Sequence, residues 1–145
     1  MYKYHIIYHN QFHFSLACGI DLGDSYVVTG GLDGSTRQRV AQYSVAGDVT
    51  YLANLNTGRY AHACSQYVDD NGDTVSLTLN ITKFLTIVMQ TLLVTAGRDT
   101  SFNYISSTEI HVQSTWSYVS SLPSGRGYLP AATVDNVVYI FGNLF

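Results

Sequence analysis

Residues 107–143, STEIHVQSTWSYVSSLPSGRGYLPAATVDNVVYIFGN, decide the fold of this chain. Three runs in this stretch are rich in β-branched and aromatic residues, namely 109–112, 115–119 and 137–141. Runs of this kind, bounded by turn residues, are typical of β-strands. Residues 122–127, between the second and third runs, contain Pro and Gly, which interrupt both helices and strands. The stretch therefore predicts short strands that are joined by turns.

The composition of the whole chain favours the same conclusion. Among its 145 residues are 12 Tyr and 12 Gly, while only 12% of the residues are charged. Aromatic and β-branched side chains pack well on pleated sheets, and Gly provides turn geometry. Because 46% of the residues are hydrophobic, the chain is long enough and apolar enough for one domain with a core. We therefore expect an all-β fold with many short strands.

Charge and hydropathy exclude several function classes. The net charge of −3 argues against nucleic acid, which is bound by clusters of Lys and Arg, and no basic patch indicates a membrane surface. Three His residues interrupt the apolar N-terminus, so we do not expect a secretory signal. The most apolar window, residues 76–94, contains polar residues and is too short for a spanning helix of ~20 apolar residues. The compartment stays open, with the cytoplasm favoured over secretion.

Neither the cysteines nor the histidines form a metal-binding pattern. Cys18 and Cys64 are too few for a disulfide scaffold and lack the spacing of metal ligands, so we expect reduced, structural thiols. His5, His9 and His13 recur every four residues, but no carboxylate or Cys supports them as ligands. We therefore predict no metal and no cofactor.

The order of signals in residues 107–143 also occurs earlier in the chain. Strand patterns lie at 14–18, 25–29, 40–43 and 49–52 in a first unit, and at 60–64, 92–96, 109–112 and 115–119 in a second. Gly58-Arg59 recurs 67 residues later as Gly125-Arg126, and the distance falls to 51 when residues 76–91, which have no counterpart, are left out. Four-stranded repeats of ~45 to 50 residues are typical of propeller blades.

The repeated motifs resemble those of kelch repeats. They are Gly30-Gly31 after an apolar strand, its degraded forms Ala96-Gly97 and Phe141-Gly142, the spaced aromatics Tyr43 and Trp116, and the turn Leu-x-x-Gly-Arg. The resemblance covers residues 12–143 apart from 76–91. It departs from the family pattern at Tyr51, where Trp is expected, and at Ile110, in the strand that should bear the Tyr.

This resemblance implies an all-β, kelch-like β-propeller fragment with about two four-stranded blades and the opening hairpin of a third. Its parts would be an N-terminal extension at 1–11, a first repeat at 12–59, a second repeat at 60–126 and a partial third repeat at 127–145. Structural roles in these repeats fall to Gly30, Gly31, Tyr43, Gly97, Trp116 and Gly142.

Residues 76–91 interrupt a strand of the second repeat. Joining Val75 directly to Leu92 would give one continuous strand pattern. Our hypothesis is that this atypical insert is not an evolved part of the fold, and the alternative is a long strand extension or hairpin.

No local pattern indicates an enzyme. The diglycine lacks the Lys and the spacing of a phosphate loop, and no Ser lies in a G-x-S-x-G elbow. Asp residues at 69–73 fit a hairpin turn better than a calcium loop. His62 is expected in the core or lining a pore, and His111 is expected to face outward. We therefore predict that the chain is not an enzyme.

Arg59 and Arg126 occupy equivalent turns between the last strand of one repeat and the first strand of the next. In kelch adaptors, which this sequence resembles, Arg at this turn lines a pocket that binds acidic peptides through charge-assisted bonds. Ser124, Arg98 and Arg37 lie on the same loops or on neighbouring ones. The alternative is that each Arg hydrogen-bonds the blade backbone.

The sequence thus predicts a protein-protein interaction module that binds an acidic peptide or protein partner, with substrate adaptor as one form of that role. The alternatives are the remnant of a kelch-propeller enzyme, of the sugar-acid isomerase or oxidase type, and an actin-binding or structural scaffold. Two blades cannot close a ring and would leave free edges. We therefore also expect self-association or further blades.

Overall fold

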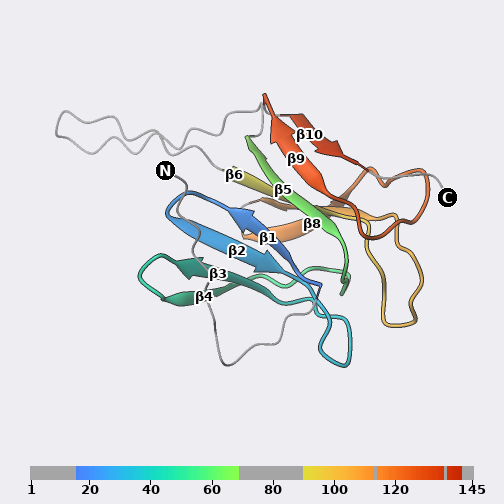
Figure 1. Ribbon diagram of the computed structural model, residues 1–145, viewed down its shortest axis with the longest axis horizontal. Helices are drawn as coiled ribbons and strands as arrows, with labels where there is room; N and C mark the ends of the chain where they lie inside the picture. Colours follow the sequence, from blue (N-terminus) through green and yellow to red (C-terminus); the bar gives the residue numbers. More distant parts are fainter. Residues whose placement is uncertain (1–15, 69–89, 113, 136, 142–145) are drawn as a thin grey trace.

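The computed structural model describes residues 16–68, 90–112, 114–135 and 137–141. In these residues the protein is all-β, as predicted, with ten strands in three antiparallel sheets and no helix. Figure 1 shows the sheets following one another in chain order, with β5 of the second sheet beside both β1 of the first and β9 of the third. We call them sheet 1, sheet 2 and sheet 3.

Sheet 1 contains four strands that are neighbours in the order of the chain: β1 (Cys18–Asp21), β2 (Ser25–Thr29), β3 (Val40–Ser44) and β4 (Val49–Leu52). A tight turn joins β1 to β2, because the Leu22 N–H donates to the Ser25 carbonyl at 2.8 Å. Alternate residues of β2 are buried, which is the pattern of a strand with one face against a core.

Sheet 2 repeats this arrangement with β5 (Ala63–Val68), β6 (Gln90–Thr95), β7 (Thr108–Val112) and β8 (Thr115–Val119). Sheet 3 is a hairpin of β9 (Ala131–Val134) and β10 (Val137–Ile140) in the described residues. The bounds of β4 and β8 agree with the sequence prediction to the residue, whereas β9 had no predicted counterpart.

The first strand of each four-stranded sheet begins later than predicted. We expected strands at 14–18 and 60–64, but β1 begins at Cys18 and β5 at Ala63. Leu16 and Ala61, two residues before these strands, have positive φ angles of 59° and 51°. An extended strand cannot continue through such a residue. Equivalent non-Gly residues therefore bend the chain just before it enters each sheet.

Several expectations fall wholly or partly outside the described residues. These are the extension at 1–11, the turn at 69–73, Gly142 and most of the insert at 76–91. The last two residues of the predicted insert, Gln90 and Thr91, belong to β6, where Thr91 pairs with Tyr67.

The loops that connect the strands of sheets 1 and 2 follow equivalent paths. The Gly31 N–H donates to the Arg59 carbonyl at 2.9 Å, and the Gly97 N–H donates to the Arg126 carbonyl at 2.7 Å. The residue before each of these Gly residues also has the same conformation, with φ of 60° at Gly30 and 62° at Ala96. The diglycine of the first unit and the Ala-Gly of the second are thus conformationally equivalent.

The hydrophobic core lies between sheets 1 and 2. Its buried members come from both sheets and from the loop after β4: Ile20, Val27, Val40, Leu55, Cys64, Leu92, Val94 and Trp116. A disulfide between Cys18 and Cys64 ties β1 to β5. The expectation of reduced thiols is therefore wrong, because the packing of these strands brings together two cysteines that are 46 residues apart in the sequence.

Candidate functional site

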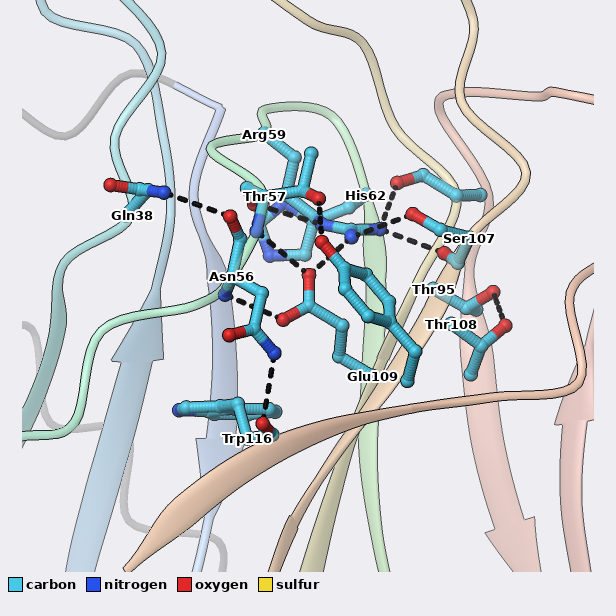
Figure 2. A network of polar contacts seen from close by, with 12 residues as sticks. Gln38, Asn56, Thr57, Arg59, His62, Thr95, Ser107, Thr108, Glu109 and Trp116 are labelled. Atoms are coloured by element: carbon cyan, nitrogen blue, oxygen red, sulfur yellow. Dashed lines mark hydrogen bonds and ion pairs between the residues drawn. The ribbon is translucent and has the colours of Figure 1, made fainter.

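A buried ion pair joins the loop after sheet 1 to sheet 2. Arg59 lies between β4 and β5, and its Nη2 donates to Glu109 Oε1 on β7 at 2.5 Å. Its Nη1 donates to the carbonyls of Ala96 and Ser107, both at 2.9 Å. Figure 2 shows the guanidinium between the Glu109 carboxylate and Ser107. We call this arrangement the Arg-Glu clamp.

The Glu109 carboxylate also holds the backbone of the loop that carries Arg59. It accepts hydrogen bonds from the N–H groups of Asn56 at 2.7 Å and Thr57 at 3.1 Å. Both side chains of the ion pair are fully buried, with 0% exposure. A buried charge needs a partner and hydrogen bonds to be tolerated, and this pair has both.

The clamp decides between the two interpretations of Arg59. The Arg59 guanidinium hydrogen-bonds backbone carbonyls and Glu109, in keeping with the alternative that this Arg binds the blade backbone. The side chain is fully buried, so it has no exposed surface that could contact a peptide. Burial lowers the pKa of Arg59, and the charge of Glu109 opposes that shift. We therefore assign Arg59 to the interior.

His62 lies in the interior beside the clamp. Its Nε2 and the Thr29 hydroxyl are 2.8 Å apart, while its Nδ1 has no hydrogen-bond partner among the described residues. Burial, assisted by the charge of Arg59, lowers the pKa of His62 to about 3. Gly30 is needed here, because a Cβ at this position would lie 2.4 Å from the Arg59 carbonyl oxygen and 2.8 Å from His62 Cε1.

The depressed pKa of His62 predicts a pH-dependent stability. The unfolded chain binds a proton at His62 below its usual pKa of 6.5, whereas the folded chain does not bind it until about pH 3. The stabilisation of the folded state by neutral His62 is therefore complete above pH 6.5. It is lost as the pH falls, by about 2 kcal/mol between pH 6.5 and 5. We expect His62→Gln to reduce the difference in unfolding free energy between pH 7 and pH 5. An unchanged difference, measured by urea unfolding, would contradict this assignment.

Arg98 lies in an exposed aromatic cluster on the loop between β6 and β7. Its guanidinium carbon is 4.3 Å from the centre of the Tyr104 ring and 5.8 Å from that of Tyr128. Tyr104 is 52% exposed and Tyr128 58%. The Arg98 backbone pairs with Tyr60 through two hydrogen bonds of 2.9 and 3.2 Å. The base of the cluster is thus fixed, while its rings face solvent.

A close approach of two loops positions this cluster. A Cβ at Gly125 would lie 2.4 Å from the Tyr104 carbonyl oxygen, so only Gly allows the 122–127 turn to lie against the loop of Tyr104. Gly125 is therefore required in this turn for close packing.

The other predicted binding residues lie in exposed or half-exposed positions. Arg37 forms a surface ion pair with Asp33 at 2.5 Å, and Arg126 Nε donates to the Ser124 hydroxyl at 3.3 Å. Because the strands alternate in direction, the loops after β2, β4, β6 and β8 all leave the same end of sheets 1 and 2. The fold therefore places Arg37, Arg98, Ser124 and Arg126 on loops at that one end.

The aromatic residues of the repeat motifs are buried, as expected for core residues. Trp116 donates its Nε1–H to the Ala53 carbonyl at 2.9 Å, and Tyr43 stacks on Tyr26 with ring centres 5.0 Å apart. The expectation for His111 is wrong: its ring tilts against Trp116 at 5.1 Å and is half-buried, so it does not point freely outward. Burial lowers its pKa.

Among the described residues, no helix is long and apolar enough to cross a membrane. The same residues contain no group of three or more His, Cys, Asp or Glu side chains that could hold a metal ion.

Comparisons with known proteins show a similarity of fold and no family. No family model matches the chain, and no curated protein matches it significantly. The structure is similar to the solved structure of YjhT, with a TM-score of 0.68 at 13% sequence identity. The match covers 92% of this chain but 40% of YjhT, so the chain spans less than half of that protein.

Proposed function

We propose that sheets 1 and 2 are two blades of a kelch-like β-propeller and that sheet 3 is the opening hairpin of a third. The support is threefold. Both four-stranded sheets have the sequential antiparallel order of a blade. Their loops have equivalent backbone hydrogen bonds. Finally, the turns with Gly-Arg occur at the same place after each sheet.

The function that we propose is that of a protein-protein interaction module. Its binding site is the loop end of sheets 1 and 2, which we call the loop-end surface and define by Arg37, Arg98, Tyr104, Ser124, Arg126 and Tyr128. Recruitment of a partner for another protein, as in a substrate adaptor, would be one use of such a surface.

The observation that carries this proposal is that the Arg98 guanidinium lies near two exposed Tyr rings. Arg and Tyr are among the residue types that contribute most to binding at protein interfaces. An Arg that is already ordered by its aromatic neighbours loses less side-chain entropy when it binds. Its donors suit a carboxylate, so the proposed partner is an acidic peptide.

Binding of an acidic peptide tests this function. We expect a fluorescently labelled peptide of alternating Glu and Tyr to bind the full chain, and Arg98→Ala or Tyr128→Ala to weaken its binding at least tenfold. Arg39→Ala is the control for the change in net charge, since Arg39 lies over Tyr51 and is not part of the Arg98 cluster. Equal binding by Arg98→Ala and Arg39→Ala, in fluorescence anisotropy, would contradict the proposal and favour the enzyme or scaffold alternatives.

A further inference from the structure

Phe102 is an exposed aromatic residue in a backbone conformation that suits glycine. It lies on loop 98–104 between β6 and β7, which a β-bridge between Arg98 and Tyr104 closes at its base. Its φ angle is 63°, and the residue is 66% exposed. Bulky residues rarely adopt a positive φ, and an exposed ring gains little from the hydrophobic effect on folding. The described part of the fold does not offset this local strain, and strain of this kind is common at binding sites.

The equivalent loop of sheet 1 has glycine at this place. Loop 32–36, after β2, is also closed by a β-bridge between its end residues, and its Gly34 has a φ of 66°. In both loops, the carbonyl of the next residue accepts the N–H of the Asp that follows the first bridge residue, at 3.1 Å. Gly adopts a positive φ at no steric cost. Phe102 therefore replaces the residue that this loop conformation favours.

The exposure of Phe102 is a property of the loop. Sheet 2 follows sheet 1 in the chain, and Gly34 is nevertheless exposed. A Cβ added at Gly34 would meet no atom within 4 Å. A side chain at this loop position therefore projects away from the sheet that carries the loop and from the sheet that follows it. The same direction at Phe102 leaves its ring open to a partner.

Hydrogen bonds within the loop fix the backbone of Phe102. The Phe102 N–H donates to the Asp99 carbonyl at 3.1 Å. Asp99 Oδ1 accepts from the N–H groups of Ser101 and Asn103 at 2.8 and 2.9 Å, and the Asn103 side-chain amide donates to Asp99 Oδ2 at 3.0 Å. The Asp99 carboxylate is thus bound within the loop. Across the part of the chain that the structure describes, Arg98 forms no ion pair with an acidic residue.

We propose that Phe102 determines which acidic peptides the loop-end surface binds, because it contacts an aromatic or apolar side chain of the peptide. This inference rests on the proposed function and names the kind of acidic peptide that binds. Arg98 and Phe102 lie on one short loop, so the acidic and the apolar residue of the partner are close in its sequence. Aromatic residues are enriched at the centres of interfaces, and a loop that is already ordered loses less entropy on binding.

The test compares two labelled peptides of equal length and charge, one of alternating Glu and Tyr and one of alternating Glu and Ser. We expect the full chain to bind the Glu-Tyr peptide about tenfold more tightly in fluorescence anisotropy. Phe102→Gly should weaken binding of the Glu-Tyr peptide about fivefold and leave binding of the Glu-Ser peptide unchanged. Phe102→Tyr, which keeps an aromatic ring, should bind both peptides as the unaltered chain does.

The stability of Phe102→Gly separates a binding role from a structural one. Because Gly suits this φ angle, the midpoint of urea unfolding should equal or exceed that of the unaltered chain. A lower midpoint would mean that the ring stabilises the fold, and it would overturn the proposal. Val45→Ala is the control, since Val45 is 79% exposed on the turn between β3 and β4, at the other end of sheet 1. It should bind both peptides normally.

Arg98→Ala separates failure of this inference from failure of the proposed function. It should weaken binding of both peptides, since both carry Glu. If Arg98→Ala weakens binding but Phe102→Gly binds both peptides as tightly as the unaltered chain, the inference about Phe102 is overturned and the proposed function stands. If neither peptide binds, or if binding is the same in Arg98→Ala, both are overturned.

Discussion

Glu109→Ala is expected to destabilise the protein by about 3–5 kcal/mol, which is the usual cost of leaving one member of a buried ion pair without its partner. The Arg59 charge would stay in the interior, and the N–H groups of Asn56 and Thr57 would lose their acceptor. Domains of this size are stable by only ~5–15 kcal/mol, so a large part of the stability would be lost. Trp116, the only Trp, is buried beside this loop and reports unfolding in urea by its fluorescence.

The matched control for this prediction is Arg126→Ala. Arg126 occupies the equivalent turn but is half-buried and makes one weak side-chain hydrogen bond. Its replacement should change the unfolding free energy by less than about 1 kcal/mol. Equal losses for Arg126→Ala and Glu109→Ala would mean that the turn, and not the ion pair, determines the stability.

Reduction of the Cys18–Cys64 disulfide is expected to cost about 4 kcal/mol, the chain-entropy estimate for a closed loop of this length. The bond joins β1 to β5 across the interface between sheets 1 and 2, and it closes a loop of 46 residues. The midpoint of urea unfolding should therefore fall when dithiothreitol is added. The double variant Cys18→Ser/Cys64→Ser should be equally destabilised in the absence of the reductant.

The control for the disulfide is the response of that double variant, whose midpoint should be the same with and without dithiothreitol. Two free thiols per native, unreduced chain in a thiol-labelling assay would contradict the prediction. The same assay, applied to protein from its natural source, bears on the compartment, because disulfides persist mainly in oxidising environments.

Much of the fold could be predicted because its strands carry local signals. The β-branched and aromatic runs of β2 and β8 predict the bounds of these strands directly. The starts of β1 and β5 could not be predicted in this way. Leu16 and Ala61 adopt a positive φ, which in sequence is normally indicated by Gly or Asn. Tertiary contacts impose the bend at these two residues, and nothing local marks it.

Less of the candidate site could be predicted from the sequence. Gly58-Arg59 was recognised as a motif, but the role of Arg59 depends on Glu109, which is 50 residues later in the chain. The available signal was a carboxylate inside a predicted strand, since such a residue is rarely buried without a cation. The disulfide could not be predicted either, because β1 and β5 come close together only through the packing of sheets 1 and 2.

The Arg59–Glu109 pair couples the loop after sheet 1 to sheet 2. A double-mutant cycle with Arg59→Met, Glu109→Leu and the combined variant measures this coupling. We predict that the combined variant loses less stability than the sum of the two single losses, with a coupling energy of about 2–3 kcal/mol in urea unfolding. Additive losses, with coupling within about 0.5 kcal/mol of zero, would mean that the two side chains do not stabilise each other.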